Sequence, residues 1–218
     1  MLSPNMPPSY NQISIDKYRN HAQSYDASAQ LTMPLRRRAI ALLRLLPGDV
    51  VLDVGAGTGL SYPLLLDGVG PAGRVLAFEQ SPQMFTQAEG RCLRELDAPR
   101  RKKVWHQCAP AEDVVLPQAA DAVLFNYVHD IARTPDAVAN IMRQLKPGAR
   151  VAIAGMKYFP WWTGPLNLFA WAKNRPYNAR AADMWSPWDI IASYCTPLQI
   201  QSTQCGMGYL AHANVKAD

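Results

Sequence analysis

The sequence has little cysteine and no long apolar run, and each absence excludes a class of protein. Its four cysteines are irregularly spaced, with no CxxC pair and no histidines at zinc-finger intervals. We therefore expect free thiols in a reducing cytoplasm, with no disulfide framework and no bound metal ion. The longest uncharged apolar segment, residues 158–172, is too short to span a bilayer and is interrupted by prolines. The start of the chain also lacks the basic and apolar stretches of a secretory signal.

Charged residues are scarce as well, at 18% of the 218 residues, whereas hydrophobic residues make up 49%. This composition excludes a disordered chain and fits one α/β domain, with or without a small lid. The formal net charge is +5, but the basic residues come in short clusters, at 36–38 and 100–103, that we interpret as solvated helix ends or loops. We therefore expect no nucleic-acid partner.

Short β-rich runs alternate with helical segments along most of the chain. The predicted strands are residues 50–54, 74–79, 103–108, 121–126 and 150–156, followed by an antiparallel hairpin at 198–203 and 208–213. The predicted helices are residues 34–46, 60–66, 82–96 and 135–145. This order predicts an α/β fold with a doubly wound, mostly parallel seven-stranded sheet.

Two segments differ in composition from this alternation of strands and helices. Residues 1–33 carry few aliphatic side chains but three tyrosines, and we interpret them as an N-terminal helical lid. The main domain then spans residues 34–218. Within it, about 157–188 holds five of the six tryptophans and is interpreted as an inserted cover over the substrate.

Residues 50–59 read VVLDVGAGTG, an apolar run broken by alternate glycines. Such glycines permit backbone torsions closed to other residues and let a ligand approach the main chain closely. A dinucleotide fold would place a third glycine at position 60, which is Leu60 here. Asp53 stands two residues ahead of the first glycine, where its carboxylate would accept hydrogen bonds from an amine but repel a pyrophosphate. The spacing favours a cofactor that carries an amino acid.

Glu79 ends the second predicted strand, twenty residues after Gly59. An acidic side chain at this place can accept both hydroxyls of a ribose, in nicotinamide enzymes as in others. Taken alone, Asp53 and Glu79 could equally be a capping carboxylate and a solvated strand end. Together with the glycines they favour a cofactor site.

The sequence resembles the class I S-adenosylmethionine-dependent methyltransferases, with closest likeness to the small ubiquinone/menaquinone C-methyltransferase-like group. The likeness is carried by VLDVGAGTG, by Glu79 within VLAFEQSPQM, by APAEDVVLP and by LKPGARVAIAG. Residues 18–26, YRNHAQSYD, also look like the group's amino-terminal signature, which folds over the cofactor. The resemblance implies a Rossmann-like methyltransferase fold and S-adenosyl-L-methionine as the cofactor.

The resemblance also implies the cofactor's contacts. Asp53, Gly55, Ala56 and Gly57 would meet the methionine moiety, and Glu79 the ribose hydroxyls. The remaining cofactor-binding candidates are Gln80 and Met84 beside the adenine, Ala111 and Glu112 at its amino group, Asn126 at the border of the crevice, and Tyr18 in the lid. Where the family usually has a glycine-containing third segment, this chain reads APAED, which leaves open which acidic group reads the adenine.

The catalytic candidates are His129, Asp130 and Tyr25. A sulfonium methyl is already activated, so alignment of the acceptor and exclusion of water matter most. Where the acceptor must lose a proton, His129 would be the base, with Asp130 orienting it. The alternative is that Asp130 caps a turn and His129 packs against the next helix. Tyr18 and Tyr25 would close over the sulfonium with their aromatic faces, or would only anchor the lid.

The tryptophan-rich segment allows several interpretations. Trp161, Trp162, Phe169 and Trp171 could line a hydrophobic pocket for an aromatic or prenylated molecule. The segment could instead form an interfacial surface with Lys173, Arg175 and Arg180 on anionic lipid, a contact in a homodimer, or ordinary packing on the core.

The predicted function is transfer of a methyl group to an oxygen, nitrogen or carbon of a small, largely apolar or aromatic molecule. The alternative acceptor is a membrane lipid or quinone, reached by peripheral membrane contact. A more distant alternative, an NAD(P)-dependent oxidoreductase, is disfavoured by Leu60 and by the lack of a Tyr-x-x-x-Lys pair. We expect a monomer or a homodimer.

Overall fold

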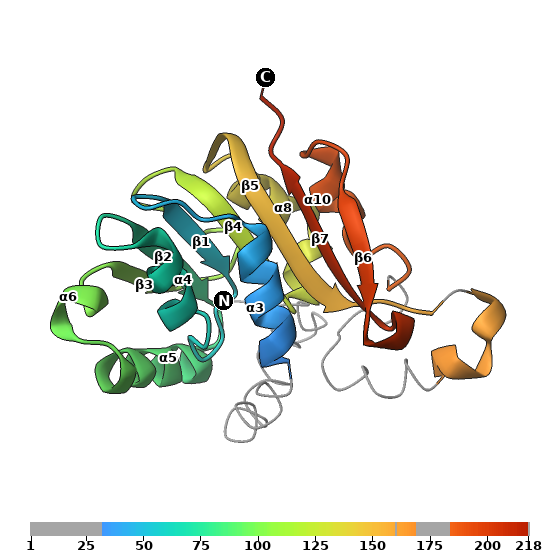
Figure 1. The fold of residues 1–218 in the computed structure, drawn as a ribbon, viewed down its shortest axis with the longest axis horizontal. Helices are drawn as coiled ribbons and strands as arrows, with labels where there is room; N and C mark the ends of the chain where they lie inside the picture. The colour runs from blue at the N-terminus through green and yellow to red at the C-terminus, as the bar shows by residue number, and fades with distance from the viewer. Residues whose placement is uncertain (1–31, 160, 169–183, 218) are drawn as a thin grey trace, which may run out of the picture.

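The computed structural model describes residues 32–159, 161–168 and 184–217, and its centre is one seven-stranded sheet (Figure 1). Most of the predicted lid, with Tyr18 and Tyr25, lies outside the described residues. The strands are β1 Val50–Val54, β2 Arg74–Glu79, β3 Val104–Cys108, β4 Ala120–Asn126, β5 Leu145–Met156, β6 Gln199–Thr203 and β7 Gly208–Asn214. The helices are α3 Met33–Leu42, α4 Tyr62–Val69, α5 Pro82–Glu95, α6 Ala98–Arg101, α7 His129–Ala132, α8 Pro135–Met142 and α10 Asp189–Ser193, with 3-10 turns η1 Trp161–Thr163 and η3 Gln204–Gly206.

The strands lie in the order β3-β2-β1-β4-β5-β7-β6. The first five are parallel, and β7 is antiparallel to both β5 and β6. The predicted doubly wound sheet with a C-terminal antiparallel hairpin is confirmed. Since strand order reverses between β1 and β4, the crevice beyond the carboxyl ends of these two strands is where such a sheet places its ligand.

Alternate residues of the central strands face two separate cores, as the two-residue period of a strand requires. Leu52 of β1 and Val123 of β4 join the core that α8 and α10 cover. Val51 and Leu124, each the neighbour of one of these residues, join the core that α3 and α4 cover on the opposite face. Helices on both faces explain why these strands read as nearly continuous apolar runs.

Two element boundaries differ from those predicted by four residues or more. Helix α3 ends at Leu42, four residues earlier than expected, because Arg44 adopts a left-handed φ of 46° and turns the chain. Strand β5 begins at Leu145, five residues earlier than expected, and the predicted turn at Pro147 and Gly148 lies inside it. The pairing with β4 shifts register between Ala120 and Ala122, which accommodates this irregular start.

The described part of the tryptophan-rich segment lies beyond the end of β5, and Figure 1 shows η1 standing away from the sheet. Its exposed side chains include Trp162 at 70%, Leu166 at 50% and Leu168 at 68%. Phe169, Trp171, Lys173, Arg175 and Arg180 lie outside the described residues.

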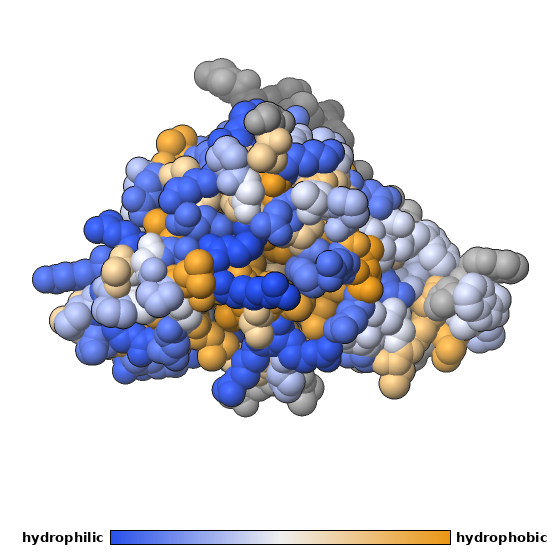
Figure 2. Space-filling view, turned by 45° about the horizontal axis from the view of Figure 1, so that its top comes forward, coloured by the Kyte–Doolittle hydropathy of each residue, from blue (hydrophilic) through white to orange (hydrophobic). Residues whose placement is uncertain are grey.

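Most of the face drawn in Figure 2 is hydrophilic, with hydrophobic side chains in patches between the polar ones. Among the described helices, none has the length and apolar character needed to cross a membrane. The described residues also hold no cluster of histidine, cysteine or acidic side chains that could bind a metal ion.

Candidate cofactor and acceptor site

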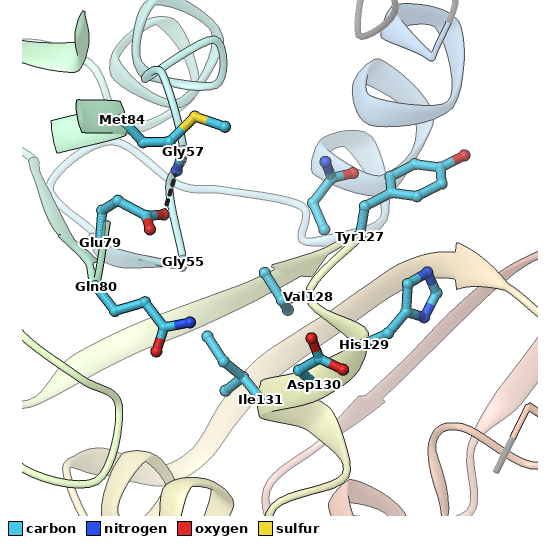
Figure 3. Close-up of a pocket in the computed structure, with 11 residues that line it drawn as sticks. Gly55, Gly57, Glu79, Gln80, Met84, Tyr127, Val128, His129, Asp130 and Ile131 are labelled. Carbon is cyan, nitrogen blue, oxygen red and sulfur yellow. Dashed lines mark hydrogen bonds between the residues drawn. The ribbon is translucent and has the colours of Figure 1, made fainter. Parts of the chain in front are cut away.

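A hollow opens at the carboxyl ends of β1, β2 and β4, where the sheet topology predicts a ligand. It contains about 490 Å³ of empty space, part of it open to solvent. Figure 3 shows Glu79, Gln80 and Met84 on one side of it and His129 and Tyr127 on the other. The lining residues are Gly55, Gly57, Glu79, Gln80, Met84, Asn126, Tyr127, Val128, His129, Asp130 and Ile131.

The glycine loop after β1 has the backbone geometry that the sequence predicts. Gly55, Gly57 and Gly59 all have positive φ, at 55°, 59° and 76°. A Cβ at Gly55 would lie 2.8 Å from Val128 Cγ1, so a side chain there would press into the wall of the hollow. Only glycine therefore both adopts the positive φ of this turn without strain and leaves the adjoining space of the hollow free.

Glu79 is fixed at the end of β2 by backbone groups from two loops. Its Oε2 accepts a hydrogen bond from the Gly57 N–H at 2.9 Å, drawn as a dashed line in Figure 3. Its Oε1 accepts one from the Ser81 N–H at 2.8 Å. Burial raises the pKa of Glu79 above its usual value, and these backbone donors oppose that shift. The carboxylate keeps further lone pairs that can accept hydroxyl hydrogens from a bound ribose.

Asp53 lies at the end of β1, behind the glycine loop, with a side chain only 1% exposed. It is not among the residues that line the hollow. One carboxylate oxygen, Oδ2, has no hydrogen-bond partner among the described residues. Asn126, which does line the hollow, likewise has both amide atoms buried without such a partner. Unsatisfied buried polar atoms are rare, so these fit a site completed by a polar ligand such as the amino-acid end of S-adenosylmethionine.

The predicted adenine contacts divide into two groups. Gln80 and Met84 line the hollow beside Glu79, as the resemblance implies. Ala111 is 1% exposed, its carbonyl accepts a hydrogen bond from Asn140 Nδ2 at 2.9 Å, and neither it nor Glu112 is among the lining residues. The role of Ala111 and Glu112 at the adenine stays a prediction.

The chain turns sharply where β4 ends and the opposite wall of the hollow begins. Tyr127 has a φ of 59°, a left-handed conformation that costs a non-glycine residue energy and often marks a functional site. Its N–H donates to the Ala154 carbonyl at 2.8 Å, which holds the turn against β5. The turn directs Val128 and Ile131 toward the glycine loop.

His129 is buried against the end of β5. Its Cε1 would lie 2.8 Å from a Cβ at Gly155, and its Nε2 accepts a hydrogen bond from the Met156 N–H at 3.4 Å. Burial and the nearby Arg133 guanidinium lower the pKa of His129 to about 3. The imidazole is therefore neutral near pH 7, with the lone pair of Nε2 already engaged.

Asp130 follows His129 and also lines the hollow. It forms an ion pair with Arg133 at 3.5 Å, and Arg133 Nε donates to the His129 carbonyl at 2.9 Å. The structure thus brings two of the three catalytic candidates from the sequence to one wall of the hollow, and the third, Tyr25, lies outside the described residues. The role of His129 as a general base stays a prediction.

Sequence reasoning misses Arg36. The cluster at 36–38 is expected to be solvated, but Arg36 is only 5% exposed, whereas Arg37 and Arg38 are exposed. The signal is present in the spacing, because Arg36 precedes Ile40 and Leu43 by four and seven residues and so shares the apolar face of the helix. Tyr127, Val128 and Ile131 also line the hollow, although the sequence pattern assigns them no role of their own.

Comparisons with known proteins point to methyltransferases. Residues 51–148 match the family model described as "Methyltransferase domain". The chain is 27% identical over 200 residues to a demethylmenaquinone methyltransferase of Symbiobacterium thermophilum, covering 80% of this chain and 78% of the relative. It is 34% identical over 123 residues to a 2-phytyl-1,4-naphthoquinone methyltransferase of Synechococcus elongatus, covering 56% of this chain and about half, 52%, of that relative.

Solved structures show the same fold. A SAM-dependent methyltransferase from Aquifex aeolicus superposes with a TM-score of 0.66 at 19% identity, covering 90% of this chain and 97% of that one. A geranyl diphosphate C-methyltransferase from Streptomyces coelicolor, solved with S-adenosyl-L-homocysteine, superposes with a TM-score of 0.67 at 17% identity, covering 85% and 67%.

Residues 51–148 form a methyltransferase domain, and S-adenosylmethionine is the cofactor of this methyltransferase. This confirms the family that the glycine loop and Glu79 indicate. The relatives named here are methyltransferases rather than nicotinamide-dependent enzymes, so the oxidoreductase alternative is dropped.

Proposed function

We propose that the protein methylates a small, largely apolar ring compound that carries a carbonyl or hydroxyl group, of the quinone or quinol type. The observation that carries the proposal is the composition of the wall opposite Glu79, where the apolar side chains of Val128 and Ile131 and the Tyr127 ring line the hollow together with the neutral His129 and with Asp130. A wall of apolar side chains with a few polar groups among them suits an apolar ring with a polar substituent. The two quinone methyltransferases among the relatives support the same substrate class.

The cofactor would be held in the hollow by side chains that are already oriented toward it. Glu79 would accept hydrogen bonds from the ribose hydroxyls, Asp53 from the amino group, and Gln80 and Met84 would flank the adenine. S-adenosylmethionine, when bound, supplies a methyl group on a positively charged sulfur that needs no further activation. The task left to the chain is to align the acceptor and exclude water.

His129 would act as a hydrogen-bond donor toward the acceptor. A neutral imidazole has one N–H and one lone pair, and Met156 N–H occupies the lone pair of Nε2. The proton therefore lies on Nδ1, which can donate to an acceptor oxygen and stabilise negative charge there. Where the acceptor must also lose a proton, the Asp130 carboxylate is the lining group that can take it.

The protein would reach such a substrate by touching the lipid surface in which apolar quinones dissolve. The exposed side chains of Trp162, Leu166 and Leu168 lie together in sequence, and Trp185 is also 50% exposed. Tryptophan is favoured at the interface between lipid and water. We propose peripheral contact of a cytoplasmic protein, either monomer or homodimer.

The experiment is a methyl-transfer assay on the full chain with methyl-labelled cofactor and a panel of acceptors. The panel holds 2-prenyl-1,4-naphthoquinol in detergent, a catechol, an isoaspartyl peptide and a short RNA. We expect a singly methylated naphthoquinol by mass spectrometry and no product from the peptide or RNA. Methylation of the peptide or RNA in preference to both ring compounds would contradict the proposal.

A further inference from the structure

A buried cation lies behind the glycine loop, on a helix that precedes the matched methyltransferase region. Arg36 sits in the first turn of α3 and is 5% exposed. Its Nη1 donates a hydrogen bond to Ser61 Oγ at 2.5 Å, and its Nε is buried with no partner among the described residues. Ser61 itself is fully buried at the start of α4.

The direction of these hydrogen bonds follows from the chemistry of the groups. A guanidinium only donates, so the Ser61 oxygen accepts from Arg36 and its own O–H is left to donate. Ser61, through a hydrogen bond, and Arg36, through its charge, both lower the pKa of the Asp53 carboxyl group. Arg36, Ser61 and Asp53 thus form a relay from α3 to the end of β1.

This relay is a poor device for stability alone. Taking a charged pair out of water costs several kcal/mol, and apolar residues of similar volume often serve a core at least as well. The neighbours of Arg36 on the same helix face, Leu35, Ala39 and Ile40, are such apolar residues. An arginine with an unused N–H therefore calls for a role beyond packing.

We propose that Arg36 is a positioning residue for the cofactor. Through Ser61 it keeps the Asp53 carboxylate ionised and turned so that Oδ2 is left for the amino group of S-adenosylmethionine. The proposal rests on the cofactor-binding role of Asp53 and adds a residue from α3, outside residues 51–148.

The charges around Asp53 make this dependence measurable. Burial raises the pKa of Asp53 to about 6, while Arg36 and the Ser61 hydrogen bond hold it down. Within the described part of the chain, the other ionisable groups that face it are Tyr62 at the start of α4 and Glu79 on β2. Both would be neutral or negative, so Arg36 is the cation that favours the ionised form of Asp53. Removing this cation must raise the pKa of Asp53.

The test is the affinity for S-adenosylhomocysteine, measured by calorimetry on the full chain from about pH 5 to about pH 9. Wild-type affinity should fall as the pH drops through about 6, the pKa of Asp53. In Arg36→Met this fall should move upward by about one pH unit, which weakens binding about twofold near pH 7 and about tenfold near pH 5. Arg36→Lys should restore most of the affinity, and the exposed Arg37→Met should match the wild type.

A purely structural role would lower the thermal midpoint of Arg36→Met and weaken binding equally at every pH. An unchanged pH midpoint in a folded Arg36→Met would therefore overturn the inference. If that variant does not fold, Ser61→Ala carries the same test, with an upward shift of about half a pH unit expected and no shift contradicting the relay. Absence of binding by the wild type would instead overturn the cofactor site itself.

Discussion

The two walls of the hollow are built in different ways. The cofactor wall comes from one short stretch, the loops after β1 and β2, and its carboxylate Glu79 is held by backbone N–H groups of Gly57 and Ser81. The acceptor wall starts at the end of β4, and His129 takes its position from Gly155 and Met156 on β5. Cofactor recognition is therefore local in sequence, whereas acceptor recognition depends on long-range packing.

The largest expected effect is the loss of cofactor affinity when a side chain is added to the glycine loop of the cofactor wall. Gly55→Val should abolish measurable binding of S-adenosylhomocysteine, a loss of about a hundredfold or more, because a β-branched residue is strained at a φ of 55° and its Cβ meets Val128 at 2.8 Å. Gly164→Ala, where a Cβ meets nothing within 4 Å, is the matched control and should bind normally. Normal binding by Gly55→Val would contradict the close approach of cofactor and loop. Calorimetry measures both variants.

Glu79→Gln tests how the backbone fixes the same wall. An amide has one oxygen where the carboxylate has two, so the N–H of Gly57 or of Ser81 would face an NH₂ group. We expect about ten- to a hundredfold weaker binding of S-adenosylhomocysteine, the usual cost of losing hydrogen bonds to a charged group. The exposed Glu89→Gln on α5 is the control. Equal affinities for the two variants would remove Glu79 from the cofactor site.

On the acceptor wall, His129→Leu should lower kcat by about tenfold or more while the affinity for S-adenosylhomocysteine changes by less than about twofold. Gly155→Ala should act in the same direction, because the added Cβ would lie 2.8 Å from His129 Cε1 and displace the ring. Turnover assays and calorimetry on both variants separate the two walls. A parallel loss of cofactor affinity would show that the walls are not independent.

The smallest effect concerns a second buried histidine, which lines neither wall. His106 on β3 packs against Tyr62 and Phe85, and both its ring nitrogens lack partners among the described residues. Burial lowers its pKa to about 4 from 6.5. The folded protein therefore binds fewer protons here than the unfolded chain, so this contribution to stability is present above about pH 6.5 and is lost as the pH falls toward 4.

His106→Phe should then raise the free energy of unfolding by about 1–3 kcal/mol, because two unsatisfied polar atoms are removed from an aromatic cluster. The gain should be larger near pH 5 than near pH 8, with cofactor affinity unchanged. Denaturant unfolding at the two pH values measures it. A loss of stability would show that the ring nitrogens of His106 have hydrogen-bond partners. A gain that does not depend on pH would show that the pKa of His106 is not lowered.

The sequence is sufficient for the sheet and the cofactor wall, since strand periodicity and the glycine spacing are local signals. It is insufficient for the acceptor wall. The low pKa of His129 arises from burial and from Arg133, and burial by β5 depends on a residue as distant as Gly155. The sequence-based prediction also fails for Arg36. The charged neighbours Arg37 and Arg38 favour a solvated cluster, but Arg36 is buried because it lies on the apolar face of the helix.

The most direct measurement is calorimetric titration of the wild-type chain with S-adenosylhomocysteine and, separately, with NADH. The account predicts saturable binding of S-adenosylhomocysteine at one site, with a Kd of about 1–100 μM, and no heat from NADH. Binding of NADH, or no saturation by S-adenosylhomocysteine at millimolar concentration, would contradict it.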